Sequence, residues 1–292
     1  MEKLQQALNK ARAARDGDAP ERGPDRVVDR TPPPPPIPSA GMARTPNRRA
    51  APRDEIWAEL PQITPDPAVL KRNRLVALDA GSAATPFDIL RTKILLQMRR
   101  NGWRRLAITS PTAGCGKTTT ALNLALGLSR QPDLTAMMLE MDLRRPSMGT
   151  MLGHRPEQDI TEMLTGRVPF AEQAVRVRGN VAISMARRAS NDPTRYMLSH
   201  ETIETVDMLE RTYQPELVIF DLPPLLISDD TRAFLGNVDC ALMVARAEKS
   251  SVSQIDTCER EIAEQTNMLG IVLNQCRLTD ESAAYEYDKL SV

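Results

Sequence analysis

The stretch LAITSPTAGCGKTTTA, residues 106–121, contains side chains whose types and spacing suggest phosphate chemistry. Its glycines allow backbone N–H groups to turn inward around an anion. At its position after the glycines, Lys117 can reach the β- and γ-phosphates of a nucleotide, and the hydroxyl of Thr118 can hold Mg²⁺. The pattern G-x-x-x-x-G-K-[ST] asks for glycine at position 111, where this chain has Pro111. We therefore predict a phosphate-binding loop with one departure from the pattern.

Three acidic residues follow apolar runs farther along the chain. Glu140 and Asp142 belong to MMLEMDLRRP, residues 137–146, and Asp221 belongs to LVIFDLPP, residues 217–224. In an open parallel sheet, ligands bind beyond the carboxyl ends of the strands. Mg²⁺ prefers oxygen ligands and usually shares them with substrate phosphates. The sequence therefore predicts that the three carboxylates converge on the phosphate-binding loop.

Strand-like and helix-like segments alternate from this loop onward. Before it, a helix is predicted from Pro86, with Thr85 as its cap, through Arg100. The predicted strands lie at 104–110, 134–141, 181–185, 216–220, 240–244 and 269–273. The predicted helices lie at 117–130, 159–165, 194–213, 229–236 and 251–266. This alternation predicts an α/β fold with a parallel sheet covered by helices on both faces.

The order of these patterns predicts four parts of the chain. They are a short N-terminal helix (1–15), a disordered linker rich in Pro and Arg (16–70), a P-loop ATPase or kinase domain (71–278) and a flexible tyrosine-bearing tail (279–292). Pro32 to Pro36 are consecutive and favour polyproline II, and the linker offers little apolar surface to offset ordering entropy. The N-terminal helix could dock on a partner or remain solvated.

Composition narrows the class of protein. Hydrophobic residues make up 41% of the chain but aromatic residues only 3%, so the core must be aliphatic. The formal net charge is zero, which argues against general nucleic-acid binding. Residues 71–105 hold nine Lys or Arg against two Asp, and this basic segment could face an anionic partner, a membrane surface or only solvent. The four cysteines lack metal-ligand spacing and are expected to be free thiols.

Three motifs carry a family resemblance. SPTAGCGKTTT, LEMDLRRP and VIFDLPP together resemble the Walker A, Walker A′ and Walker B elements of bacterial tyrosine kinases (BY-kinases) of capsule and exopolysaccharide export. The segments DITEMLTG (159–166), 229–251 and LGIVLNQ (269–275) are also similar to that family, as are Asn191 and Pro193 before a helix. The resemblance covers about residues 75–292 and implies a P-loop NTPase-like fold.

The resemblance also implies roles for particular residues. Lys117, Asp142 and Asp221 would be catalytic, Thr118, Asp142 and Asp221 would hold Mg²⁺, and Asn274 would lie near the adenine. The implied ATP-binding residues are Ala113, Gly114, Cys115, Gly116, Lys117, Thr118, Thr119 and Asn274. The phosphoacceptors would be Tyr285 and Tyr287 in the tail AYEYDKLSV. The implied activity is tyrosine autophosphorylation with ATP and Mg²⁺.

Three features depart from the family pattern. Glu140 stands where the family usually has Asp, and it could still bind Mg²⁺ through water or could weaken that binding. The Glu-x-x-Arg-x-x-Arg oligomerisation motif aligns with Thr85, Asp88 and Arg91, so only its last residue is kept. The tail has few tyrosines. These departures leave ring assembly and the extent of phosphorylation open.

The sequence also suggests a location and partners. No apolar run approaches the roughly 18 residues of a membrane span, and the N-terminus lacks a signal-peptide core. We therefore expect a cytoplasmic protein recruited peripherally to the inner membrane. By resemblance its partners would be a membrane adaptor of the polysaccharide co-polymerase class, a protein-tyrosine phosphatase and further copies of itself.

Two other functions fit parts of the pattern. A Min/Par-type positioning ATPase shares the fold and the three motifs, but that family usually has Lys where this chain has Thr112. A nucleotide-binding regulator without transfer activity would tolerate Glu140 and the short tyrosine cluster. ATP hydrolysis without protein phosphorylation would identify the ATPase, and nucleotide binding alone would identify the regulator.

Overall fold

The computed structural model describes residues 53–276. The strands of this part are β1 (Gln62–Ile63), β2 (Arg105–Thr109), β3 (Ala136–Glu140), β4 (Val175–Val177), β5 (Val181–Ser184), β6 (Leu217–Asp221), β7 (Cys240–Arg246) and β8 (Asn267–Asn274). The helices are α2 (Arg53–Ala58), α3 (Pro67–Arg72), η1 (Ser82–Ala84), α4 (Thr85–Asn101), α5 (Lys117–Leu128), α6 (Met148–Leu152), α7 (Ile160–Leu164), α8 (Phe170–Gln173), α9 (Pro193–Met197), α10 (His200–Tyr213), α11 (Asp229–Leu235) and α12 (Val252–Ala263).

One sheet contains the eight described strands, in the order β1-β4-β5-β3-β6-β2-β7-β8. The strands from β5 through β8 in this order pair in parallel, which confirms the predicted parallel core. β4 was not predicted; it pairs with β5 in antiparallel fashion, and β1 adds to β4 in parallel. The sheet is therefore mixed. β2 lies between β6 and β7, so the loop that follows β2 has a strand on each side.

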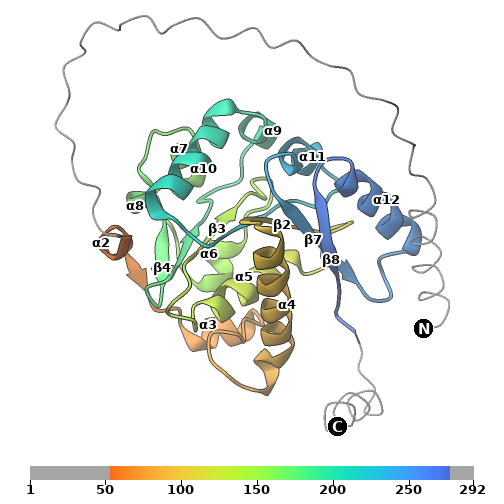
Figure 1. Cartoon of the computed structure of the whole chain (residues 1–292), viewed down its shortest axis with the longest axis horizontal. Coiled ribbons are helices and arrows are strands. Elements are labelled where there is room, and N and C mark those ends of the chain that lie inside the picture. The colour runs from red at the N-terminus through yellow and green to blue at the C-terminus, as the bar shows by residue number, and fades with distance from the viewer. Residues whose placement is uncertain (1–52, 277–292) are drawn as a thin grey trace, which may run out of the picture. The chain divides into compact units, whose positions relative to one another are not determined.

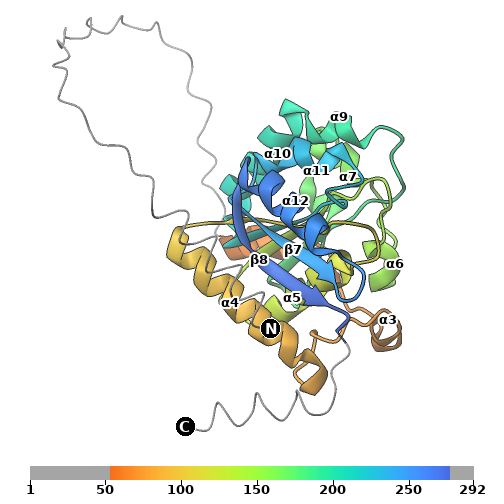
Figure 2. The same ribbon diagram turned by 90° about the vertical axis from the view of Figure 1, so that its right-hand side faces the viewer.

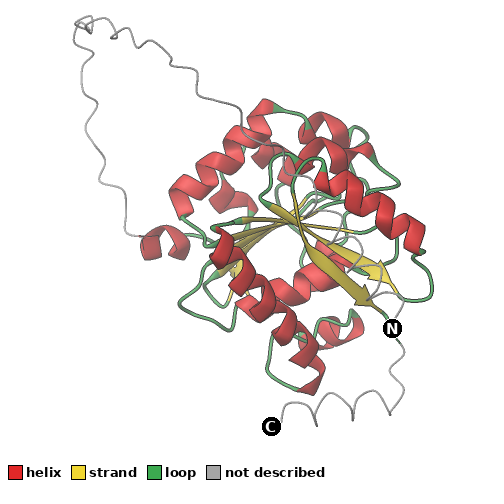
Figure 3. Cartoon of the chain, turned by 45° about the vertical axis from the view of Figure 1, so that its right-hand side comes forward, coloured by secondary structure: helices red, strands yellow, loops and turns green. Residues whose placement is uncertain are grey.

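Helices cover both faces of the sheet, as predicted (Figures 1 and 3). Successive strand residues point to opposite faces, and in β2 Leu106 and Ile108 join one core cluster while Ala107 joins the other. The cluster on the first face includes residues of α3, α4, α5 and α6, and the other includes residues of α2, α7, α8, α10, α11 and α12. Figure 2 shows α4 and α12 on opposite sides of β7 and β8. Both core clusters are largely aliphatic, as the composition required.

The predicted linker extends too far along the chain. Residues 53–70, which the sequence pattern assigned to it, form α2, β1 and most of α3. Trp57 in α2 is buried, and its indole N–H donates to the carbonyl of Tyr213 at 2.8 Å. The Trp57 and Tyr213 rings also meet edge to face. These contacts offset the loss of conformational entropy on ordering residues 53–70, for which the sequence analysis found too little apolar surface. The predicted N-terminal helix, the rest of the linker and the tail lie outside the described residues.

Two local predictions were also wrong in detail. The helix predicted over 194–213 is divided into α9 and α10, with Ser199 as the extended N-cap of α10. Thr85 is not the N-cap of α4, which is Ala84: Thr85 is the first residue of α4, and its hydroxyl donates to the Gly81 carbonyl. The cysteines within the described range are free thiols, as expected. Between Arg53 and Cys276, no helix has both the length and the apolar character needed to cross a membrane.

Candidate nucleotide site

The loop between β2 and α5 has the conformation that a phosphate-binding loop requires. Gly114 has φ of 79° and Gly116 has φ of 88°, a region that favours glycine. A Cβ on Gly116 would also collide with the side-chain amide of Asn274. Gly116 caps the N-terminus of α5, where unpaired N–H groups and the helix dipole attract anions. The sequence therefore folds here into a cradle for phosphate.

Lys117 lies between two carboxylates, one at the end of β6 and one two residues after β3. Its Nζ is 2.7 Å from Asp142 Oδ2 and 3.5 Å from Asp221 Oδ1. Asp221 is completely buried, and Lys117 and Asp142 are largely buried. Burial acts to lower the pKa of Lys117, but the charges of Asp221 and Asp142 outweigh it and raise that pKa above its usual value. The structure thus brings together the three side chains predicted to be catalytic.

Thr118 and Asp221 fit the binding of Mg²⁺. The Thr118 hydroxyl donates to Asp221 Oδ2 at 2.7 Å, while Asp221 Oδ1 is buried and has no hydrogen-bond partner among the described residues. Burial raises the pKa of Asp221, although Lys117 and Thr118 act to lower it. Within residues 53–276, no three His, Cys, Asp or Glu side chains are grouped to hold a metal ion by themselves. A Mg²⁺ ion here would complete its coordination with phosphate oxygens and water.

Glu140 does not join this group, contrary to the expectation that three carboxylates converge. Its Oε1 accepts the backbone N–H groups of Ser147 and Met148, and its Oε2 accepts that of Ala186 at 3.0 Å. Glu140 and Asp221 are register partners on β3 and β6, yet Glu140 anchors the loops after β3 and β5. Burial raises the pKa of Glu140 to about 7, although the three N–H donors act to lower it. Glu140 therefore holds together the two loops that follow β3 and β5.

The end of β8 supports the phosphate-binding loop from the side. Asn274 Nδ2 donates to the Cys115 carbonyl at 2.9 Å, and Gln275 Nε2 donates to the Gly114 carbonyl at 3.1 Å. The sequence prediction placed Asn274 near the adenine, and in the structure its amide contacts the loop backbone. The sequence analysis did not predict a role for Gln275. Its position directly after an apolar strand could have indicated one, because strand ends in this sheet lie beside the phosphate-binding loop.

Another buried carboxylate, which the sequence analysis missed, lies next to the Asp142 loop. Arg144 donates through Nε to Asp230 Oδ2 at 2.6 Å and through Nη2 to Asp230 Oδ1 at 3.1 Å. Thr194 and Ser228 also donate to Asp230, each at 2.5 Å. Asp230 is fully buried, and burial acts to raise its pKa, but the hydrogen bonds from Arg144, Ser228 and Thr194 outweigh burial and lower that pKa. Arg144 thereby connects the Asp142 loop to α9 and α11.

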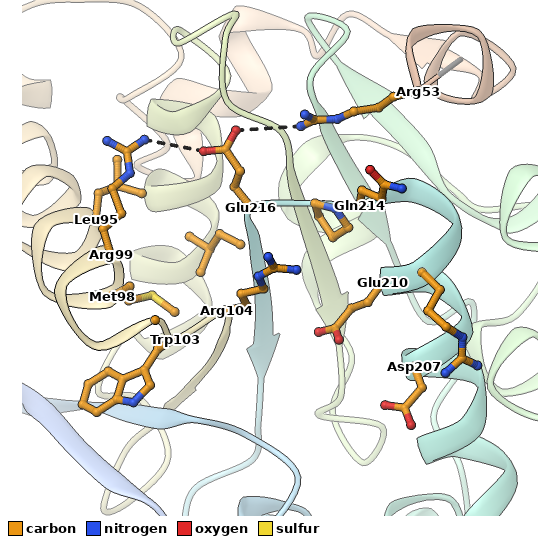
Figure 4. A pocket seen from close by; sticks show the side chains of 14 residues that line it. Arg53, Leu95, Met98, Arg99, Trp103, Arg104, Asp207, Glu210, Gln214 and Glu216 are labelled. Atoms are coloured by element: carbon orange, nitrogen blue, oxygen red, sulfur yellow. Dashed lines mark ion pairs between the residues drawn. The ribbon is translucent and has the colours of Figure 1, made fainter. Parts of the chain in front are cut away.

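A cavity of about 930 Å³ lies at the opposite end of the sheet. It is lined in part by residues 102–104, which precede β2, and 214–217, where β6 begins. In Figure 4, Glu216 points between Arg53 and Arg99, with which it forms ion pairs of 3.8 and 3.5 Å. Because the phosphate-binding loop follows the other end of β2, this cavity is not part of the nucleotide site. The predicted acceptors Tyr285 and Tyr287 fall outside the described residues.

A mainly parallel sheet with a glycine loop, an adjoining Lys-Thr pair and two aspartates at or just after strand ends defines a P-loop NTPase. The ParA family, described as the NUBPL iron-transfer P-loop NTPase, matches residues 103–289. The chain belongs to this family of P-loop NTPases.

Its relatives include bacterial tyrosine kinases. YwqD of Bacillus subtilis, named a tyrosine-protein kinase, is 27% identical over 220 residues, which cover 73% of this chain and 90% of YwqD. AmsA of Erwinia amylovora is 27% identical over 212 residues, which cover 69% of this chain but only 28% of AmsA. The fold is similar to the kinase domain of the Escherichia coli tyrosine kinase ETK, with a TM-score of 0.64, 22% identity and coverage of 70% of this chain and 81% of that domain. These findings confirm the resemblance to bacterial tyrosine kinases.

Proposed function

We propose that this protein is an ATP-dependent protein-tyrosine kinase that phosphorylates tyrosines of its own C-terminal tail. The arrangement of Lys117 between Asp142 and Asp221, beside the Thr118 hydroxyl, supports this proposal most directly. Phosphoryl transfer depends mainly on positioning and charge neutralisation, with little covalent work by the protein. The names of the relatives as tyrosine-protein kinases support the choice of acceptor.

Each buried side chain has a definite part in the proposed reaction. Lys117 neutralises charge that develops between the β- and γ-phosphates. Thr118 and Asp221 would hold Mg²⁺, which would supply further positive charge to the phosphates. Asp142 orients the tyrosine hydroxyl and accepts its proton. Because the usual pKa of tyrosine is near 10, the proton leaves late in transfer. The acceptors are Tyr285 and Tyr287.

The proposed physiological role is to regulate the polymerisation and export of capsular or exopolysaccharide. The kinase would be cytoplasmic and recruited to the inner membrane by an adaptor of the polysaccharide co-polymerase class, and a protein-tyrosine phosphatase would reverse its action. Self-association through α4 would differ from the family pattern, because Asp88 forms ion pairs with Arg91 and Arg130 of the same chain. Ring assembly that needs Asp88 and Arg91 free would have to break these pairs.

Mass spectrometry after incubation with ATP and Mg²⁺ tests the proposal. Wild type, Lys117→Met and the double variant Tyr285→Phe/Tyr287→Phe are compared while phosphate release is followed. The expected result is a phosphate-sized mass gain on the C-terminal peptide of wild type that is absent from both variants. Phosphate release with no gain in protein mass would contradict the kinase assignment.

A positioning ATPase is the second candidate, because the matching family is ParA and the fold is also similar to McdA of Cyanothece, with a TM-score of 0.50 and 20% identity. That function predicts hydrolysis without protein phosphorylation. A nucleotide-binding regulator would show neither activity. The same experiment therefore distinguishes the three functions.

A further inference from the structure

Four exposed arginines lie on the Asp142 loop and on two loops near it, and the proposed reaction does not use them. We name this set the arginine rim; it consists of Arg145, Arg155, Arg187 and Arg188. Arg145 belongs to the turn that begins at Asp142, since its backbone N–H donates to Asp142 Oδ1 at 3.2 Å. Arg155 and Arg187 line a hollow of about 420 Å³ together with Pro146, the residue after Arg145. Arg145 therefore adjoins the candidate catalytic carboxylate, and the hollow beside Pro146 connects its loop to Arg155 and Arg187.

The two loops that carry most of the rim are fastened to each other. The Ser190 N–H donates to the Leu143 carbonyl at 2.8 Å, and Glu140 accepts N–H groups from both loops. The N–H groups of Arg187 and Arg188 both donate to the buried Asp159 carboxylate. These hydrogen bonds hold the backbone of the loops in place. The exposed rim side chains therefore extend into solvent from a fixed backbone.

The rim carries positive charge that the described residues do not neutralise. The ion pairs within residues 53–276 involve Lys117, His200 or other arginines, and none includes a member of the rim. Arg144, between Asp142 and Arg145, is already paired with Asp230. The exposed acidic residues on the same loops are Glu157 and Asp192, and neither forms an ion pair with the rim. The surface beside Asp142 therefore attracts an anionic partner.

The tail of this chain has the complementary charge. Residues 280–288, DESAAYEYD, contain four carboxylates and no basic residue, and these carboxylates lie on both sides of Tyr285 and Tyr287. We propose that the arginine rim is the docking surface for this acidic segment, so that carboxylates flanking a tyrosine pair with rim guanidinium groups while the tyrosine hydroxyl reaches Asp142. Arginine suits this task because its planar fork matches a carboxylate. The proposal rests on the proposed kinase function. It adds that the kinase site selects tyrosines flanked by acidic residues.

A binding experiment tests the docking surface without requiring catalysis. The probe is a fluorescent peptide of residues 279–292, TDESAAYEYDKLSV. The protein that binds the peptide is the full chain with a neutralised tail, so that its own tail competes less with the peptide. The four substitutions are Asp280→Asn, Glu281→Gln, Glu286→Gln and Asp288→Asn. We expect saturable binding by anisotropy that weakens as salt is raised. Arg187→Glu/Arg188→Glu should weaken it at least tenfold, whereas the exposed pair Lys93→Glu/Arg100→Glu on α4 should leave it unchanged.

A neutral peptide with the same four substitutions is the matched probe, and equal binding of the two peptides would overturn the proposal. An unchanged affinity in Arg187→Glu/Arg188→Glu would also overturn it. So would a rim that leaves the peptide unbound but binds vesicles containing phosphatidylglycerol, because the rim would then be a membrane surface. Failure of the kinase proposal looks different: the peptide would bind through the rim but would never gain phosphate.

Discussion

At the scale of single residues, the site depends on one buried cation between two buried carboxylates. Removing one partner of such a group leaves an uncompensated charge. We expect Lys117→Met to lower the free energy of unfolding by about 3 kcal/mol at pH 8 in the absence of nucleotide. Burial already raises the pKa of Asp221, and without Lys117 its carboxyl would take up a proton more readily. The loss should therefore shrink at pH 5. Urea denaturation at the two pH values measures this, and an equal loss at both would contradict it.

Glu140 provides a second test at this scale. The folded-state pKa of about 7 exceeds the ordinary value of 4.5, so the favourable contribution of the protonated form is complete below pH 4.5 and is lost as pH rises through 7. The difference between the two values corresponds to about 3 kcal/mol. Between pH 5 and pH 8 we expect wild type to lose about this much stability relative to Glu140→Gln, whose side chain does not titrate. Parallel pH dependence of the two proteins would show that Glu140 is ionised throughout.

At the scale of elements, the junction between β2 and α5 depends on Gly116. A side chain there meets both an unfavourable positive φ and the amide of Asn274. We expect Gly116→Ala to reduce ATP affinity at least tenfold and to destabilise the domain by more than the roughly 1–2 kcal/mol that the backbone conformation alone costs. Gly114→Ala is the matched control, since its φ is 79° but its nearest contact is 3.9 Å away.

The same element allows a double-variant test of the collision. Asn274→Ala should restore part of the stability lost in Gly116→Ala, because it removes the colliding amide but not the strained φ. Chemical denaturation of the single and double variants measures the coupling. Strict additivity of the two changes would show that Asn274 does not restrict the residue at position 116.

At the scale of the whole molecule, the domain begins before the region that the sequence patterns marked. Trp57 connects α2 to the end of α10. We expect Trp57→Ala to lower the free energy of unfolding by about 3–5 kcal/mol, whereas Glu55→Ala on the exposed side of α2 should change it by less than about 0.5 kcal/mol. Thermal or urea unfolding measures both. A negligible effect of Trp57→Ala would mean that residues 53–63 are dispensable for the fold.

A second prediction at this scale concerns whether Tyr285 and Tyr287 are phosphorylated in the nucleotide site of their own chain or of another copy. Because the tail is short and tethered, we expect phosphorylation between copies of the chain. Mixing Lys117→Met, which keeps its tyrosines, with the active double variant Tyr285→Phe/Tyr287→Phe should place phosphate on the Lys117→Met chain. Peptide mass spectrometry identifies the labelled chain. Phosphorylation of wild type with none on Lys117→Met in the mixture would instead indicate transfer within one chain.

The sequence by itself determined the parts of this protein that depend on local pattern. Residues 106–121 specify strand, glycine loop and helix in one continuous stretch, and apolar runs ending in Asp142 and Asp221 place two carboxylates at the same sheet edge. Only the tertiary structure decided what Glu140, Asp230 and Trp57 do. Their partners lie 46, 86 and 156 residues away along the chain. Hydrogen bonds across such separations depend on how loops pack, and no local periodicity records that packing.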